Sequence, residues 1–160
     1  CDSMFEEQAQ PINATGVKAC IIVSSYHSEI TNELAKAARD CFVEAGGNED
    51  DCHLLPAPGA WELPLIAQEA ARNLEVDVVV ALGCVLTGET THDRVIADAI
   101  STGLMNVSLN ERKPIAMGIL TCQTLEQAQA RSGGDKGNKG EEAMYAALAS
   151  HETIQSTRTS

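Results

Sequence analysis

The sequence predicts an α/β fold in which a parallel sheet carries helices on both faces. Apolar, β-branched runs alternate along the 160 residues with segments whose apolar residues recur at helical spacing. Aromatic residues make up only 3% of the chain and hydrophobic residues 44%, so the core must be largely aliphatic. A chain of this length buries about 70% of its unfolded surface, which is enough for one domain without disulfides.

The first half of the chain begins with a predicted buried strand over 18–24, a nearly continuous apolar run. Apolar residues then recur every three or four positions over 28–45, which predicts a helix that ends at Gly46-Gly47. A short strand at 52–55 leads into a helix with Pro64 in its first turn, where a missing N–H costs nothing.

The second half continues this alternation. Residues 77–82 are the clearest predicted strand, and a glycine-containing turn leads from them into a helix with an apolar face over 95–107. The next predicted strand spans 115–120. Residues 124–127 (Thr-Leu-Glu-Gln) have the pattern of a capping box, which predicts a helix from there to about Arg131.

The same patterns divide the chain into three expected parts. Residues 1–16 form a polar N-terminal arm, 17–150 a single domain, and 151–160 a polar C-terminal tail that is expected to fray. Inside the domain, a loop rich in glycine and lysine at 132–140 separates the capped helix from a last helix at 141–150. No internal repeat and no second domain are visible.

The composition excludes several classes of partner. The formal net charge is −12 and no long basic run is present, so neither nucleic acid nor an anionic membrane is an expected partner. No stretch is apolar for long enough to span a bilayer, and no signal peptide is visible. The cysteines show no metal-like spacing, which favours buried free thiols in a reducing, cytoplasmic compartment over a zinc site or a disulfide framework. They are Cys1, Cys20, Cys41, Cys52, Cys84 and Cys122.

Open parallel sheets bind ligands beyond the carboxyl ends of their strands. In this chain, two segments that follow predicted strands offer ring and backbone contacts to a ligand there. Tyr26 offers a flat face to a planar ligand, and packing on the next helix explains it equally well. His27 beside it is expected to be solvated or to cap the helix. In the rigid turn 58–64 the backbone amides are available to a ligand. Core or interface packing accounts for Trp61, and the helix dipole accounts for Glu62.

Two further segments indicate an anion site. Gly88 allows close backbone approach, the free N–H groups of the following helix start bind anions, and His92 adds a proton-transfer group beside them. This segment is neither a Walker A loop nor a dinucleotide-binding fingerprint. Arg131 opens a ten-residue segment that holds three of the eleven lysine and arginine residues, which favours phosphate capture over a flexible solvated loop.

Five motifs, in order and spacing, resemble those of the lumazine synthase family. The resemblance runs from about Val17 to Leu148 without insertions, and the joint register of the motifs carries it. The motifs are Gly59-Ala60-Trp61-Glu62-Leu63-Pro64, Ala81-Leu82-Gly83-Cys84-Val85, Gly88-Glu89-Thr90-x-His92, Thr124-Leu125-Glu126-Gln127-Ala128-x-x-Arg131-x-Gly133 and Gly137-Asn138-Lys139-Gly140-x-Glu142-Ala143.

The resemblance implies a flavodoxin-like three-layer α/β/α sandwich with a four-stranded parallel sheet. It implies a transferase of riboflavin biosynthesis that joins 5-amino-6-(D-ribitylamino)uracil to 3,4-dihydroxy-2-butanone 4-phosphate, giving 6,7-dimethyl-8-ribityllumazine. Inorganic phosphate and water are released, and neither a metal nor an organic cofactor is needed. It also implies homopentamers, often assembled into icosahedral shells, with sites between neighbouring subunits, and riboflavin synthase as a further partner.

The resemblance also assigns roles residue by residue. Catalysis falls to His92 as proton donor, to Arg131 as the phosphate-binding arginine and to Lys139, with Glu142 nearby. Met117 lies where the neighbouring subunit contributes an aromatic side chain. The other substrate-binding residues that it implies are Tyr26, Ala60, Trp61, Glu62, Cys84, Val85 and Leu86 for the rings and the ribityl chain, and Glu89 and Thr90 for the phosphate side.

Five positions depart from the family pattern. Tyr26 replaces a phenylalanine, His27 an asparagine and Thr87 a basic residue, while Asp93 and Met117 stand where aromatic residues are common. We expect these changes to affect rate and affinity more than the reaction itself. Two alternatives stay open: an archaeal-type riboflavin synthase, which needs no phosphate site, and a non-catalytic homologue that binds flavin or lumazine or forms shells.

Overall fold

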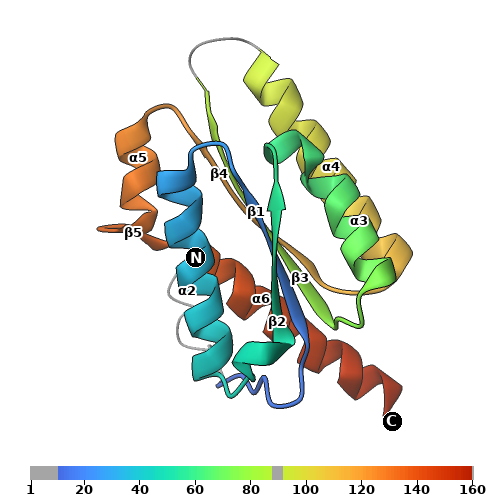
Figure 1. The fold of residues 1–160 in the computed structure, drawn as a ribbon. Helices are drawn as coiled ribbons and strands as arrows, with labels where there is room; N and C mark the ends of the chain where they lie inside the picture. The colour runs from blue at the N-terminus through green and yellow to red at the C-terminus, as the bar shows by residue number, and fades with distance from the viewer. Residues whose placement is uncertain (1–10, 88–91, 160) are drawn as a thin grey trace.

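The computed structural model describes residues 11–87 and 92–159 (Figure 1). Its centre is a sheet of four parallel strands in the order β2-β1-β3-β4, which confirms the predicted α/β class and strand number. The strands are β1 (Ala19–Ser24), β2 (Cys52–Ala57), β3 (Val78–Leu86) and β4 (Ile115–Cys122). The helices are α2 (Ser28–Glu44), α3 (Leu63–Asn73), α4 (His92–Glu111), α5 (Leu125–Ala130) and α6 (Lys139–Arg158), with short 3-10 turns η1 (Glu49–Asp51) and η2 (Ala60–Glu62).

Helices cover both faces of the sheet, α2 and α6 on one and α3 and α4 on the other (Figure 1). Successive strand residues point to opposite faces, so Ile21 joins the core under α2 and α6 whereas Ile22 joins the core under α3 and α4. The second core is tight where the helices cross: a Cβ on Gly103 would lie 3.0 Å from Pro64. Within the described residues, no helix is both long and apolar enough to cross a bilayer.

Strand β3 is longer than the sequence predicts. The predicted strand end at Leu82 is wrong, because the strand continues through Gly83 to Leu86. A Cβ on Gly83 would lie 3.2 Å from Leu63 Cδ1 and 3.4 Å from Ala60 Cβ. Glycine therefore marks a close approach of η2 and α3 to the strand rather than a turn.

The C-terminal third also differs from expectation. Strands β5 (Ser132–Gly134) and β6 (Gly137–Asn138) form a small antiparallel hairpin where a loop was predicted. Helix α6 begins at Lys139, and the Asn138 side chain caps it by accepting the N–H groups of Gly140 and Glu141 at 2.8 and 3.3 Å. The capping asparagine and the hairpin fix where Lys139 stands.

The expectation of a frayed tail after residue 150 is wrong as well. Helix α6 runs on to Arg158 because this segment is tied to the start of the chain. The backbone N–H of Asn13 donates to Glu152 Oε1 at 2.7 Å, and Ile154 is half-buried. The described end of the arm packs on the domain too, since Ala14 is fully buried and its N–H donates to the carbonyl of Ala45.

Candidate active site at the carboxyl ends of β3 and β4

The site begins where the last two strands of the sheet end side by side. Leu86 pairs with Cys122, and the backbone N–H of Thr87 donates to the Cys122 carbonyl at 2.6 Å. The next described residue is His92, which is exposed at the first turn of α4. Residues 88–91, with the predicted contacts Gly88, Glu89 and Thr90, lie outside the described residues.

A cationic cavity of about 270 Å³ opens beside these strand ends, on the face that α6 covers. The residues that line it come from β4, the end of α5, the β5–β6 turn and the start of α6. They are Ile119, Leu120, Thr121, Cys122, Arg131, Lys136, Lys139 and Glu142. The structure thus brings Arg131 and Lys139 to one cavity, where three positive side chains face a single carboxylate.

Local hydrogen bonds set the positions of these cations. Arg131 ends α5, and its Nη1 donates to the Gln127 carbonyl at 3.4 Å. The backbone N–H of Lys139 donates to the Arg131 carbonyl at 2.9 Å, so the two residues are held together across the hairpin. Lys139 Nζ lies 3.9 Å from Glu142 Oε2, one turn along α6. This pairing leaves Arg131 as the better phosphate ligand of the two.

The start of α5 confirms half of the predicted capping box. The Thr124 hydroxyl oxygen accepts the Gln127 N–H at 3.2 Å. The return bond runs from the N–H of Gln123, not of Thr124, to the Gln127 side-chain oxygen at 2.8 Å. Together these two bonds fix the start of α5. They therefore also fix the position of Arg131, about one and a half turns further along the chain.

A second cavity, of about 750 Å³, lies on the α4 side of the same strand ends. Thr87 and Thr121 line it together with Asp93, Arg94 and Asp98. Two carboxylates against one guanidinium make this side unfavourable for an anion. Thr121 lines both cavities, so the edge strand separates an anion-attracting face from an anion-repelling one.

Two aromatic side chains stand exposed near the other strand ends. Tyr26 is 67% exposed and Trp61 60% exposed, so packing within the chain is wrong for both. Packing of Trp61 at an interface stays a prediction. The Tyr26 ring lies edge-on to His27, with ring centroids 4.5 Å apart. Glu62 is half-buried and folds back over the preceding turn, where a Cβ on Gly59 would lie 3.2 Å from its Oε2.

The residues of the second predicted ring-binding stretch differ in exposure. Cys84 is buried in the core under α2 and α6, whereas Val85 and Leu86 are half-buried. Burial raises the pKa of the Cys84 thiol to about 11, and the nearby Cys122 and Glu29 raise it further. A thiol with that pKa is protonated at neutral pH and is no nucleophile.

Among the described residues of the predicted site, Met117 lies away from the strand ends. It pairs with Ala81 in the middle of the sheet, and the Ser101 hydroxyl lies 3.3 Å from its sulfur. Cys122 lies five residues further along the strand, a distance of about 16 Å. Its role in the site of a neighbouring subunit, which the family resemblance implies, stays a prediction.

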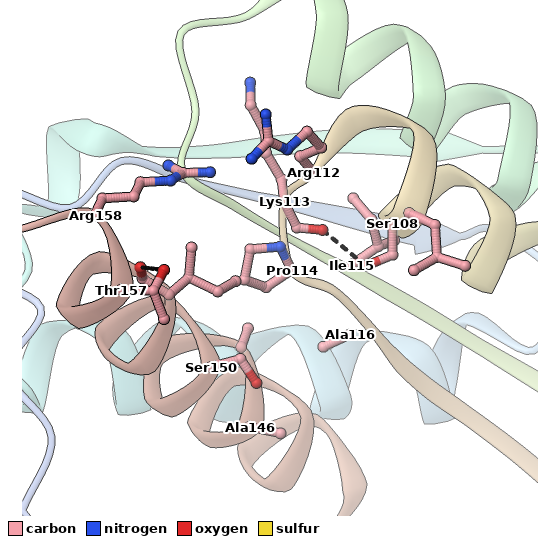
Figure 2. Close-up of a pocket in the computed structure, with 13 residues that line it drawn as sticks. Ser108, Arg112, Lys113, Pro114, Ile115, Ala116, Ala146, Ser150, Thr157 and Arg158 are labelled. Carbon is pink, nitrogen blue, oxygen red and sulfur yellow. Dashed lines mark hydrogen bonds between the residues drawn. The ribbon is translucent and has the colours of Figure 1, made fainter.

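A third cavity, of about 620 Å³, lies at the opposite end of the sheet (Figure 2). Arg112, Lys113 and Arg158 border it, between the ends of α4 and α6. Lys113 is already engaged, since its Nζ donates to the Ala71 carbonyl at 2.8 Å and its own carbonyl accepts the Ser108 hydroxyl. The cavity lies at the amino end of β4, away from every predicted motif, so it is not the candidate site.

The comparison with known proteins decides the family. The family model of 6,7-dimethyl-8-ribityllumazine synthase matches residues 16–155. The chain belongs to this family. Its relatives include the 6,7-dimethyl-8-ribityllumazine synthases of Aquifex aeolicus, 41% identical over 92% of this chain and 96% of the relative, and of Rhodopirellula baltica, 42% identical over 85% and 88%. The Thermus thermophilus protein of that name is 40% identical over 86% of this chain and 87% of its own.

Lys136 is the charged residue of the cationic cavity to which the sequence interpretation gave no individual role. It lies just before the lumazine synthase motif that starts at Gly137, so the motif does not mark it. The clustering of basic residues after Arg131 was the available signal. No metal-binding group of three or more acidic, histidine or cysteine side chains occurs in the parts of this family member that the structure describes.

Proposed function

We propose that this chain condenses 5-amino-6-(D-ribitylamino)uracil with 3,4-dihydroxy-2-butanone 4-phosphate to 6,7-dimethyl-8-ribityllumazine, releasing phosphate and water. The observation that carries the proposal is the cavity in which Arg131, Lys136 and Lys139 meet at the carboxyl ends of β3 and β4. A local excess of positive charge in a chain with net charge −12 is what a phosphorylated substrate requires. Family membership supplies the reaction.

The proposed mechanism gives each group one task. Arg131 holds the phosphate of the butanone, and the exposed Tyr26 ring stacks on the pyrimidine, while Trp61 and Glu62 bind the ring and the ribityl chain. The amine attacks the ketone, and proton transfers with loss of water give an imine. Phosphate is then eliminated, and the ring closes with loss of a second water. His92 exchanges the protons, because an imidazole both gives and takes them near neutral pH.

The assembly in this proposal is a homopentamer in which a neighbouring subunit completes each site. Large apolar side chains support it, because they stand exposed along α4 and on β4. They are Val95, Met105, Leu109 and Met117. An icosahedral shell, an association with riboflavin synthase and a cytoplasmic location stay predictions of the sequence.

The alternative activity is less well supported. An archaeal-type riboflavin synthase joins two lumazines and needs no phosphate site, so it gives no reason for three cations around one cavity. A non-catalytic homologue has no need of a proton-transfer group such as His92 at the start of α4. The departures at Tyr26, Thr87, Asp93 and Met117 are the observations in its favour.

One assay tests the proposal. Purified protein is mixed with both substrates, and the absorbance of the lumazine product is followed against the spontaneous reaction. We expect a rate proportional to protein concentration and one phosphate released for each lumazine. A rate equal to that of the spontaneous reaction would contradict the enzyme proposal, and binding of the product without turnover would favour the non-catalytic homologue.

A further inference from the structure

The three cations of the cavity beside β4 differ in the partners that they already have. The Nζ of Lys139 lies 3.9 Å from Oε2 of Glu142. Arg131 donates one hydrogen bond, from Nη1 to the Gln127 carbonyl. The Lys136 side chain makes neither an ion pair nor a hydrogen bond within the described residues. Among the described residues, it is therefore the one cation of the cavity whose side chain has no partner.

The backbone fixes the place from which Lys136 reaches the cavity. Its N–H donates to the Ala130 carbonyl at 2.9 Å, so the residue is anchored next to Arg131. The hairpin lies directly on the end of α5, because a Cβ on Gly134 would come within 2.8 Å of Ala130 Cα. Gly137, with a φ of 84°, then turns the chain back toward α6. A flexible tip would not hold a lysine beside Arg131, whereas this anchored turn does.

We infer that Lys136 is a second phosphate-binding residue, which selects for the phosphorylated ketone; the inference rests on the proposed function. A phosphate monoester carries close to two negative charges at neutral pH. The planar guanidinium of Arg131 neutralises part of the phosphate charge. The carboxylate of Glu142 offsets the positive charge of Lys139. Lys136 supplies the remaining positive charge. As a point charge on a flexible stem, it contributes attraction rather than orientation.

The test compares three variants of the full chain. Lys136→Gln removes the charge, and Lys136→Arg keeps it. Lys36→Gln makes the same charge change at an exposed position of α2 that lines a different cavity. Binding of inorganic phosphate is measured by calorimetry without turnover, and the KM of each substrate is measured in the lumazine assay.

We expect Lys136→Gln to weaken phosphate binding and to raise the KM for the butanone phosphate, each by roughly threefold to tenfold. In Lys136→Gln, the KM for the pyrimidine and kcat stay unchanged. Lys136→Arg keeps most of the phosphate affinity. Lys36→Gln behaves as the wild type in both readouts. The affinity difference shrinks at high salt, because the interaction is largely electrostatic.

The outcomes separate this inference from the proposed function. An active wild type whose Lys136→Gln variant matches Lys36→Gln in both readouts overturns the role of Lys136. A wild type that forms no lumazine but binds phosphate through Lys136 contradicts the proposed reaction and keeps the anion site. A wild type without phosphate affinity and without turnover overturns both.

Discussion

The backbone N–H of Thr87 donates to the carbonyl oxygen of Cys122 at 2.6 Å, and the Thr87 hydroxyl lies 3.3 Å from the same oxygen. This link fastens the carboxyl end of β3 to that of β4. Cys122 also lines the cationic cavity, so the segment that leads toward His92 starts at the wall that Arg131 faces. Two parts of the chain that are remote in sequence are thereby fixed relative to each other before any substrate binds.

Replacement of Arg131 tests the phosphate side of this arrangement. Arg131→Ala is expected to raise the KM for the butanone phosphate by roughly 10-fold to 100-fold, because it removes a charge-assisted, forked contact to phosphate. The KM for the pyrimidine should change less than twofold. Steady-state kinetics with each substrate varied in turn measures both. Arg131→Lys should recover only part of the loss, and equal effects on the two substrates would show that the assigned role is wrong.

Replacement of His92 tests the proton-transfer step. His92→Ala is expected to lower kcat by about 100-fold or less, at the lower end for a general acid or base, because holding two substrates together supplies most of the acceleration. Both KM values should stay near those of the wild type. The matched control is His53→Ala, an exposed histidine on β2. A His92→Ala variant with unchanged kcat would remove His92 from the mechanism.

Much of the fold follows from local sequence patterns. The strands and helices are predictable because apolar runs and helical spacing indicate which residues are buried. The run that contains Ile21 and Ile22 is an example, because Ile21 faces one core and Ile22 the other. Long-range contacts account for the errors. Gly83 is a turn signal by itself, but in the structure it is a strand residue that pairs with Ile119 of β4. The tail after residue 150 is helical because Glu152 meets Asn13.

The candidate site is predictable to the extent that its residues follow strand ends. Arg131 and Lys139 meet as expected because β4, α5 and α6 all contribute to one cavity. Side-chain exposure was harder to predict for Trp61, which is exposed, whereas the burial of Cys84 among apolar neighbours follows the prediction of buried thiols. Lys136 went unassigned because its position depends on a backbone bond to Ala130, which leaves no trace in the sequence.

His27 provides a test of backbone strain at the start of α2. Its φ of 58° and ψ of 51° lie in the left-handed region, where asparagine is better tolerated than histidine. The strained position persists because the His27 carbonyl accepts the N–H groups of Ile30 and Thr31. His27→Asn is expected to raise the free energy of unfolding by about 0.5–1 kcal/mol and the Tm by about 1–4 °C.

His27→Ala is the matched control for this prediction. Like His27→Asn, it removes the edge contact between residue 27 and the Tyr26 ring. Alanine keeps a Cβ but cannot make the local hydrogen bonds of an asparagine side chain. Thermal unfolding at one protein concentration should therefore rank the asparagine variant above the wild type and the alanine variant at or below it. Equal Tm values for the two variants would show that the left-handed backbone costs nothing here.

Cys20 links burial to alkaline stability. Burial, with a smaller effect of the nearby Cys52, raises the pKa of its thiol to about 12. In the unfolded chain the thiol ionises near its usual pKa of about 8.5, so the unfolded state loses a proton that the folded state keeps. The resulting stability is fully present below that pH and is lost as the pH rises toward 12, by about 1.4 kcal/mol per pH unit.

Cys20→Ala should remove this part of the decline in urea unfolding between pH 9 and 10.5. Val79→Ala, at the paired position of β3 and equally buried, should lower stability at every pH and keep the wild-type slope. If the slopes of the two variants coincide, the thiol of Cys20 does not ionise on unfolding as argued.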